Sequence, residues 1–282
     1  DDQVYNYNNE GRYIELERVY ASMRPRMVDE RIVYLADALT GRYFNRPLEA
    51  IPALETLLEK YPDSSNIDFQ GAMVLQRGSN QMVAGQYGDA ADGVEEYIEE
   101  LRRSGVNEPL LYALQFVDRC GNALRDYPPA EMVRPDRDIK VPIHYKPAGR
   151  GEHLMIPVTI GDHTHDFVFD TGCSTFNYIS EECARKLGVK ILADNIPITG
   201  VERGSVKLGI VPQMEVGGMV YRNAVFMIAP EAANRQGAIN IDAILGADFM
   251  KAAGEFSIYS EDGFILFPHL KHAKPKEGSN MY

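Results

Sequence analysis

The chain has 282 residues, with 41 acidic against 29 basic residues and a formal charge of −12. An acidic surface without a sizeable basic patch repels phosphate backbones, so nucleic acid is not an expected partner. No stretch approaches the roughly 20 apolar residues that cross a bilayer. A content of 45% apolar and 25% charged residues excludes a fibrous or wholly disordered chain. The length suggests about two domains.

The first part of the chain, from residue 10 to about residue 127, has the pattern of amphipathic helices. Ile51, Leu54 and Leu58 form an apolar stripe between residues 48 and 60. A second stripe lies between residues 89 and 103 and contains Val94, Tyr97, Ile98 and Leu101.

The two stripes align at an offset of about 43, each preceded by a partner helix near residues 28–42 or 69–85. These hairpins resemble tetratricopeptide-like repeats, although that family has a period of about 34. The pattern fits either an array of helical hairpins or an ordinary helical bundle, with a third pair around residues 110–117.

Prolines mark the end of the helical part. Five of them interrupt any helix between residues 128 and 150, namely Pro128, Pro129, Pro135, Pro142 and Pro147. We therefore predict a linker over residues 128–150, with an extended piece at residues 139–145.

From residue 151 the pattern becomes that of a β protein. Apolar runs at residues 154–160 and 165–170 flank Gly161-Asp162 and predict a hairpin. The further elements expected in chain order are a short helix capped by Ser180, strands at 206–216 and 219–228, a buried strand at 241–245, a short helix at 247–253 and a last hairpin at 256–267. The tail at residues 269–282 is polar.

The segment Asp170-Thr171-Gly172 carries the strongest chemical signal. It follows the apolar run Phe167-Val168-Phe169, and an aspartate at the end of such a strand is costly to bury unless it is hydrogen-bonded. Glycine lets the backbone turn sharply and present its N–H groups. Taken alone, Asp170 could equally cap an ordinary loop.

A second motif lies downstream, where Ile244-Leu245-Gly246 is followed by the helix expected at residues 247–253. With Asp170-Thr171-Gly172, this order resembles the retropepsin-like aspartic peptidases over residues 154 to 267. In that family a hairpin delivers the Asp-Thr-Gly triplet, and a hydrophobic-hydrophobic-glycine element passes beside it. Cys173 departs from the alanine or serine that is usual in the family.

The helical periodicity of the first part and the resemblance of the second part together give the expected fold class. We expect an all-α array of helical hairpins at residues 1–127, followed after the linker by an all-β retropepsin-like acid protease barrel at residues 151–268.

The resemblance also implies the activity, an aspartic endopeptidase that needs two carboxylates and one water. This chain offers one such triplet, so the family pattern implies a homodimer in which Asp170 of each chain supplies one carboxylate. Thr171 would brace the two loops, and Gly172 would complete each catalytic turn.

Substrate contacts are expected from a flap and from the glycine element. The best flap candidate is a glycine-bearing segment with Gly200, Val201 and Gly204, although two charged residues lie near its tip. Ile244 and Gly246 are the contacts expected from the other side.

Asp242 and Asp248 are the two other acids near the glycine element in the sequence. A single-chain pair of Asp170 with Asp242 would remove the need for a dimer, but we favour a strand-edge position for Asp242. We expect Asp248 to bond backbone N–H groups at the start of its helix.

Other chemistries fit less well. His163 and His165 have the spacing of a metal pair, but no third ligand is near, so a solvated hairpin face is the better interpretation. An aspartate after an apolar strand also occurs at phosphate-handling sites, which need a second acidic cluster and alternating β/α units. We expect no cofactor and no metal.

A rival function is a non-catalytic peptide-binding or scaffold protein that uses the protease-like domain for dimerisation. We expect the chain to be exported, to a periplasm or to the exterior, since it begins at Asp1 without a leader. Three cysteines, Cys120, Cys173 and Cys183, do not form a disulfide framework, and a bridge between Cys173 and Cys183 is doubtful.

Overall fold

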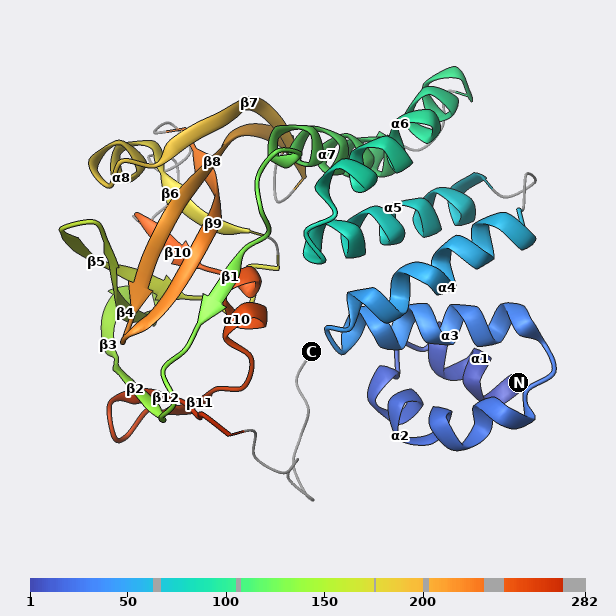
Figure 1. Cartoon of the computed structure of the whole chain (residues 1–282), viewed down its shortest axis with the longest axis horizontal. Coiled ribbons are helices and arrows are strands. Elements are labelled where there is room, and N and C mark those ends of the chain that lie inside the picture. Colours follow the sequence, from blue (N-terminus) through green and yellow to red (C-terminus); the bar gives the residue numbers. More distant parts are fainter. Residues whose placement is uncertain (63–66, 105–107, 175, 200–202, 231–240, 271–282) are drawn as a thin grey trace. The chain divides into compact units, whose positions relative to one another are not determined.

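The computed structural model describes residues 1–62, 67–104, 108–174, 176–199, 203–230 and 241–270. The chain divides into two compact units, one helical up to residue 125 and one β-rich from residue 126 (Figure 1). None of the helices in these described ranges has the length and apolar character needed to cross a membrane.

The helical unit consists of consecutive helices joined by short turns. In chain order they are α1 (Asp2–Asn9), α2 (Tyr13–Met23), the 3-10 helix η1 (Arg24–Arg26), α3 (Glu30–Tyr43), α4 (Pro47–Lys60), α5 (Ile67–Val83), α6 (Tyr87–Ser104) and α7 (Glu108–Leu124).

From α3 to α6, each helix packs against the helix that follows it in the chain, as Figure 1 shows. Leu54 and Leu57 of α4 are buried in one apolar cluster with Met73 of α5. A second cluster joins α5, α6 and α7 and includes Val94 and Leu114. The apolar stripes expected on α4 and α6 are therefore confirmed as core positions.

The turns that end α1, α3 and α5 share one hydrogen-bond pattern. In each, the residue with positive φ is the one after the C-cap: Gly11 at 68°, Asn45 at 53° and Gly85 at 74°. The N–H group of the next residue donates to a carbonyl five residues back, as in Arg46 N to Gly41 O at 2.7 Å. These turns recur at spacings of 34 and 40 residues, so the offset of about 43 taken from the stripes does not describe them.

Gly41 allows α3 and α4 to approach closely. A Cβ atom on Gly41 would lie 2.8 Å from both Cβ and N of Ala50, and the Ala50 backbone has no room to move without shifting α4. The glycine is thus required by packing and not by its φ angle.

We predict that Gly41→Val destabilises the helical unit by about 1–3 kcal/mol, because the added side chain must push α4 away. Denaturant unfolding followed by the circular dichroism of the helices measures this loss. The control is Gly88→Ala, where the new Cβ would meet only the flexible side chain of Arg125. Equal stability of Gly41→Val and the wild type would contradict the close packing.

In its described residues, the β-rich unit contains two sheets and two short helices. Its elements are β1 (Glu131–Val133), β2 (Ile139–Pro142), β3 (His144–Ala148), β4 (Gly151–Ile160), β5 (His163–Phe169), β6 (Asn177–Ser180), α8 (Glu181–Lys186), β7 (Lys190–Thr199), β8 (Arg203–Val216), β9 (Met219–Ala229), β10 (Ala243–Leu245), α10 (Ala247–Ala253), β11 (Ser257–Tyr259) and β12 (Phe264–Phe267).

The larger sheet closes on itself. Its strands run in the order β1-β9-β6-β10-β5-β4-β8-β7, and β8 also pairs with β9. The enclosed core includes Phe167, Phe226 and Phe249, all fully buried. The expected hairpins are confirmed, with β4 and β5 joined at Gly161 and β8 and β9 joined at Gly217. Ser180 accepts a hydrogen bond from Cys183 N at 3.1 Å and caps α8, as predicted.

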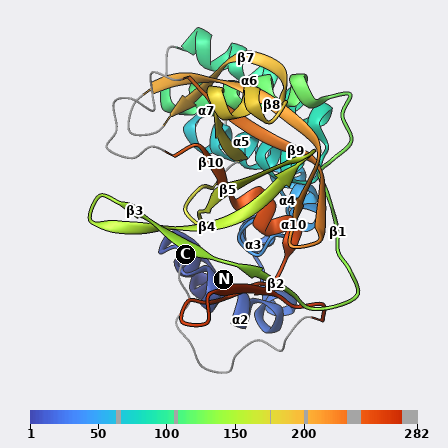
Figure 2. The same ribbon diagram turned by 90° about the vertical axis from the view of Figure 1, so that its left-hand side faces the viewer.

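The segment at residues 128–150, expected as a linker, supplies three strands. β1 pairs with β9, β2 pairs with β12, and β3 pairs with β4, beside which it runs in Figure 2. Pro142 ends β2 and Pro147 lies on the outer strand β3, where a missing N–H group leaves the sheet intact, and the other three prolines lie between the elements. The prolines therefore exclude helix here but do not exclude strand.

The first turn of α10 contains a partly buried acid, Asp248. Asp248 lies in the first turn of the helix but makes no capping hydrogen bond in the described structure, contrary to our expectation. Burial raises the pKa of its carboxyl to about 6, and Lys251 opposes this only in part.

This shift predicts a pH dependence of stability. Because the folded-state pKa is raised, the stability contribution of Asp248 is complete below about pH 4 and is lost as the pH rises through about 6. The loss is at most about 3 kcal/mol, since one pKa unit corresponds to about 1.4 kcal/mol. Asp248→Asn should therefore be more stable than the wild type at neutral pH. Denaturant titrations measure the difference in the free energy of unfolding, which should vanish near pH 4. A difference that does not change with pH would contradict this account.

Candidate active site

Asp170 directly follows β5, at the point where the strand leaves the sheet. Its backbone N–H donates to Leu245 O at 3.2 Å, which keeps this residue aligned with β10. Its carboxylate Oδ1 accepts a hydrogen bond from Gly172 N at 2.8 Å. The Asp170 side chain is partly buried, and Thr171 and Gly172 are exposed. The loop thus orients one carboxylate and leaves it accessible to a ligand.

Gly172 has a steric role in this turn. A Cβ atom on Gly172 would lie 3.2 Å from Oδ1 of Asp170, a tight contact that would weaken the hydrogen bond of its N–H group. Asp170, Thr171 and Gly172 form this turn, and the N–H group of Gly172 holds the Asp170 carboxylate.

β10 inserts between two strands that flank the loop. It runs parallel to β5, with Ile244 beside Val168, and antiparallel to β6, with Ile244 beside Tyr178. This insertion places Gly246 directly at the Asp170 loop.

Gly246 is the point of closest approach. A Cβ atom there would lie 2.9 Å from the carbonyl oxygen of Cys173 and 3.0 Å from that of Phe176. The next residue, Ala247, donates its N–H group to Cys173 O at 2.8 Å. Gly246 is buried, so it supports the loop from beneath, whereas Ile244 is only partly buried.

Asn177 is a site residue that the sequence reasoning missed. Its side chain is fully buried, accepts from Gly246 N at 3.2 Å and donates to Val225 O at 3.1 Å. It therefore ties the glycine element to β9 across β6. An asparagine between Phe176 and Tyr178, in an apolar strand, was the available signal.

Among the described residues, Asp242 does not form a pair with Asp170 within one chain. The parallel register of β10 and β5 sets Asp242 level with Asp166, four residues before Asp170, which at 3.3 Å per residue is about 13 Å away. Asp242 instead lies 3.9 Å from Nε2 of His165. Its position just before β10 agrees with the strand-edge expectation.

A cavity of about 650 Å³ lies beside this strand pair. It reaches Val168, which is two residues before Asp170 and so faces the same side of β5. The lining residues are His144, Tyr145, Lys146, Pro147, His153, Met155, Thr164, His165, Asp166, Val168, Ile241 and Asp242. His144 Nε2 lies 3.2 Å from an oxygen of Asp166. The wall next to the candidate catalytic acid thus combines apolar and charged groups.

The predicted flap belongs to the hairpin of β7 and β8. Ile198 pairs with Gly204, and Thr199 pairs with Arg203. Gly204 is exposed, while Gly200 and Val201 lie outside the described residues.

His163 and His165 lie on β5 as expected, and His165 packs edge-on against Phe167 at 6.1 Å. Across the described residues no group of three or more His, Cys, Asp or Glu side chains could hold a metal ion. Cys120, Cys173 and Cys183 form no disulfide bond with one another, and burial raises the pKa of Cys183 to about 11.

Comparisons with known proteins bear on this geometry. Residues 156–249 match the family model of aspartyl proteases, a stretch that contains the Asp170 loop, Asn177 and Gly246. The chain is also similar to a solved structure described as a retropepsin-like aspartic protease from Rickettsia conorii. The identity is 17% and the TM-score 0.32, over 49% of this chain and 92% of that chain.

No curated protein matches the chain. The family match spans the hairpin that delivers Asp170, the inserted strand β10 and the start of α10. The β-rich part of this chain is therefore similar to aspartyl proteases over residues 156–249, and an N-terminal helical region precedes it.

Proposed function

We propose that the protein is an aspartic endopeptidase whose catalytic site forms from two copies of the chain. The observation that carries the proposal is the loop at Asp170, whose carboxylate is oriented by Gly172 N and remains accessible. The match to aspartyl proteases over residues 156–249 supports a peptidase activity in general.

The need for a second chain follows from the positions of the acids. Peptide hydrolysis by this route uses two carboxylates about 3 Å apart, and Asp242 is held about 13 Å along the strand from Asp170. If two chains pair about a twofold axis beside the Asp170 loop, Asp170 of the second chain provides the second carboxylate. Exposed Thr171 would then contact its own counterpart.

The chemistry requires the two carboxylates to share one proton. Like charges at this distance do not both ionise, so one acid stays protonated. The ionised acid takes a proton from a water molecule as that water attacks the peptide carbonyl, and the protonated acid donates to the carbonyl oxygen. Collapse of the tetrahedral intermediate breaks the C–N bond.

Substrate would lie along the cavity that reaches Val168. The β7–β8 hairpin is the proposed flap, with Gly200, Val201 and Gly204 as its glycine-bearing end. Ile244 is the proposed contact from β10, and Gly246 acts by holding the loop.

We predict that Asp170→Asn lowers the rate of peptide hydrolysis by at least about a thousand-fold, since the amide cannot exchange protons with water. The amide oxygen still accepts from Gly172 N, so thermal unfolding should remain that of the wild type. Cleavage of a quenched fluorescent unfolded protein, with and without a statine-type inhibitor, measures the activity. Wild-type rates in the variant would refute the assignment. Peptide binding without any inhibitor-sensitive cleavage in the wild type would favour a scaffold.

A mixing experiment tests the shared site. When equal amounts of wild type and Asp170→Asn exchange subunits, only dimers with two wild-type chains are active, so activity should fall to about one quarter. Complete sites within single chains would leave about one half. Sedimentation showing an active monomer at every concentration would also exclude the two-chain model.

A further inference from the structure

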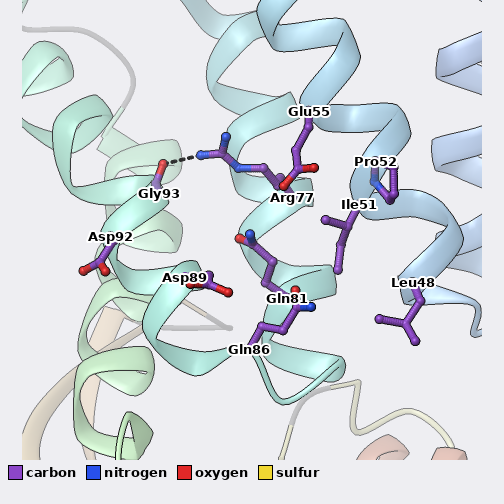
Figure 3. Close-up of a pocket in the computed structure, with 10 residues that line it drawn as sticks. All are labelled: Leu48, Ile51, Pro52, Glu55, Arg77, Gln81, Gln86, Asp89, Asp92 and Gly93. Carbon is purple, nitrogen blue, oxygen red and sulfur yellow. Dashed lines mark hydrogen bonds between the residues drawn. The ribbon is translucent and has the colours of Figure 1, made fainter.

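The helical unit contains a cavity of its own, of about 530 Å³, between α4, α5 and α6 (Figure 3). It is lined by Leu48, Ile51, Pro52, Glu55, Arg77, Gln81, Gln86, Asp89, Asp92 and Gly93. In Figure 3 the side chains of Arg77 and Gln81 extend from α5 into this space.

Arg77 is seated in the cavity wall by a glycine. Its Nη2 donates to Gly93 O at 2.6 Å, and a Cβ atom on Gly93 would lie only 2.6 Å from the same nitrogen. Glycine inside a helix costs about 1 kcal/mol relative to alanine, and here it makes room for a guanidinium. Burial lowers the pKa of Arg77.

Both side chains have unused hydrogen-bonding capacity. Arg77 Nε and Gln81 Oε1 are buried, and neither has a hydrogen-bond partner among the described residues. Gln81 as a whole is only 6% exposed. A buried polar atom without a partner costs about 1–3 kcal/mol, so a donor and an acceptor left open in one cavity favour a ligand that offers both.

The rim of the cavity is acidic. Glu55 on α4 and Asp89 on α6 are exposed and form no ion pair in the described parts of the chain, whereas Asp92 pairs with Arg125 at 2.6 Å. The whole helical region also carries an excess of negative charge, since residues 1–127 hold 22 acidic and 13 basic residues. Anionic ligands are therefore disfavoured despite the presence of Arg77.

We propose that this cavity binds an extended cationic peptide segment. A peptide main chain presents alternating carbonyl and N–H groups, which can accept from Arg77 Nε and donate to Gln81 Oε1 after rotation of these two long side chains. Lysine or arginine side chains of the peptide meet Glu55 and Asp89, and their aliphatic stems lie on Leu48 and Ile51. This site is independent of the proposed catalytic chemistry.

The test measures binding of a short fluorescein-labelled peptide of alternating lysine and alanine to full-length Asp170→Asn protein, by fluorescence anisotropy. The Glu55→Gln/Asp89→Asn variant should raise the Kd about five-fold. The matched control, Glu59→Gln/Glu96→Gln, removes two charges from the same helices outside the cavity and should leave the Kd unchanged. An equal loss in both variants, or preference for a glutamate-alanine peptide, would overturn the proposal.

The variant Gln81→Leu distinguishes a loss of peptide binding from a loss of stability. Replacing an unpartnered buried amide with an apolar side chain should maintain or raise the thermal stability, while it weakens peptide binding. If Gln81→Leu binds the peptide as tightly as the parent protein, the cavity is not the binding site.

Discussion

The geometry of the candidate site depends on how closely the backbone at Gly246 approaches the loop that holds Asp170. A single Cβ atom there would fall 2.9 Å from the Cys173 carbonyl, so only glycine permits the contact. Asn177 completes the arrangement by accepting from Gly246 N and donating to Val225 O. The carboxylate is therefore oriented by a network of backbone and amide hydrogen bonds that lies beneath it, and its upper side stays free.

This construction bears on the proposal that two chains share one catalytic site. The strand that supports the loop, β10, runs parallel to β5, and the register sets its acid Asp242 far down the strand from Asp170. In the proposed mechanism, the second acid reaches the loop from another copy of the chain. Symmetric pairing of two identical loops is the simplest geometry that satisfies the chemistry.

The helical unit uses glycine in a comparable way but for another purpose. Gly41 brings α3 against α4, and Gly93 gives a guanidinium its place in a cavity wall. In the wall of that cavity, the buried atoms Arg77 Nε and Gln81 Oε1 have no hydrogen-bond partner among the described residues. Binding of a ligand in the cavity would offset the cost of these unpaired atoms.

Local patterns in the sequence determined the helices, the hairpins and the triplet Asp170-Thr171-Gly172, because periodicity and turn chemistry are properties of neighbouring residues. The tertiary structure alone decided the role of Asn177, whose partner Gly246 is 69 residues away. It also decided that residues 131–133 join the sheet beside β9, where prolines had indicated a linker. Register and burial depend on which distant strands meet, and that information is absent from any single segment of the chain.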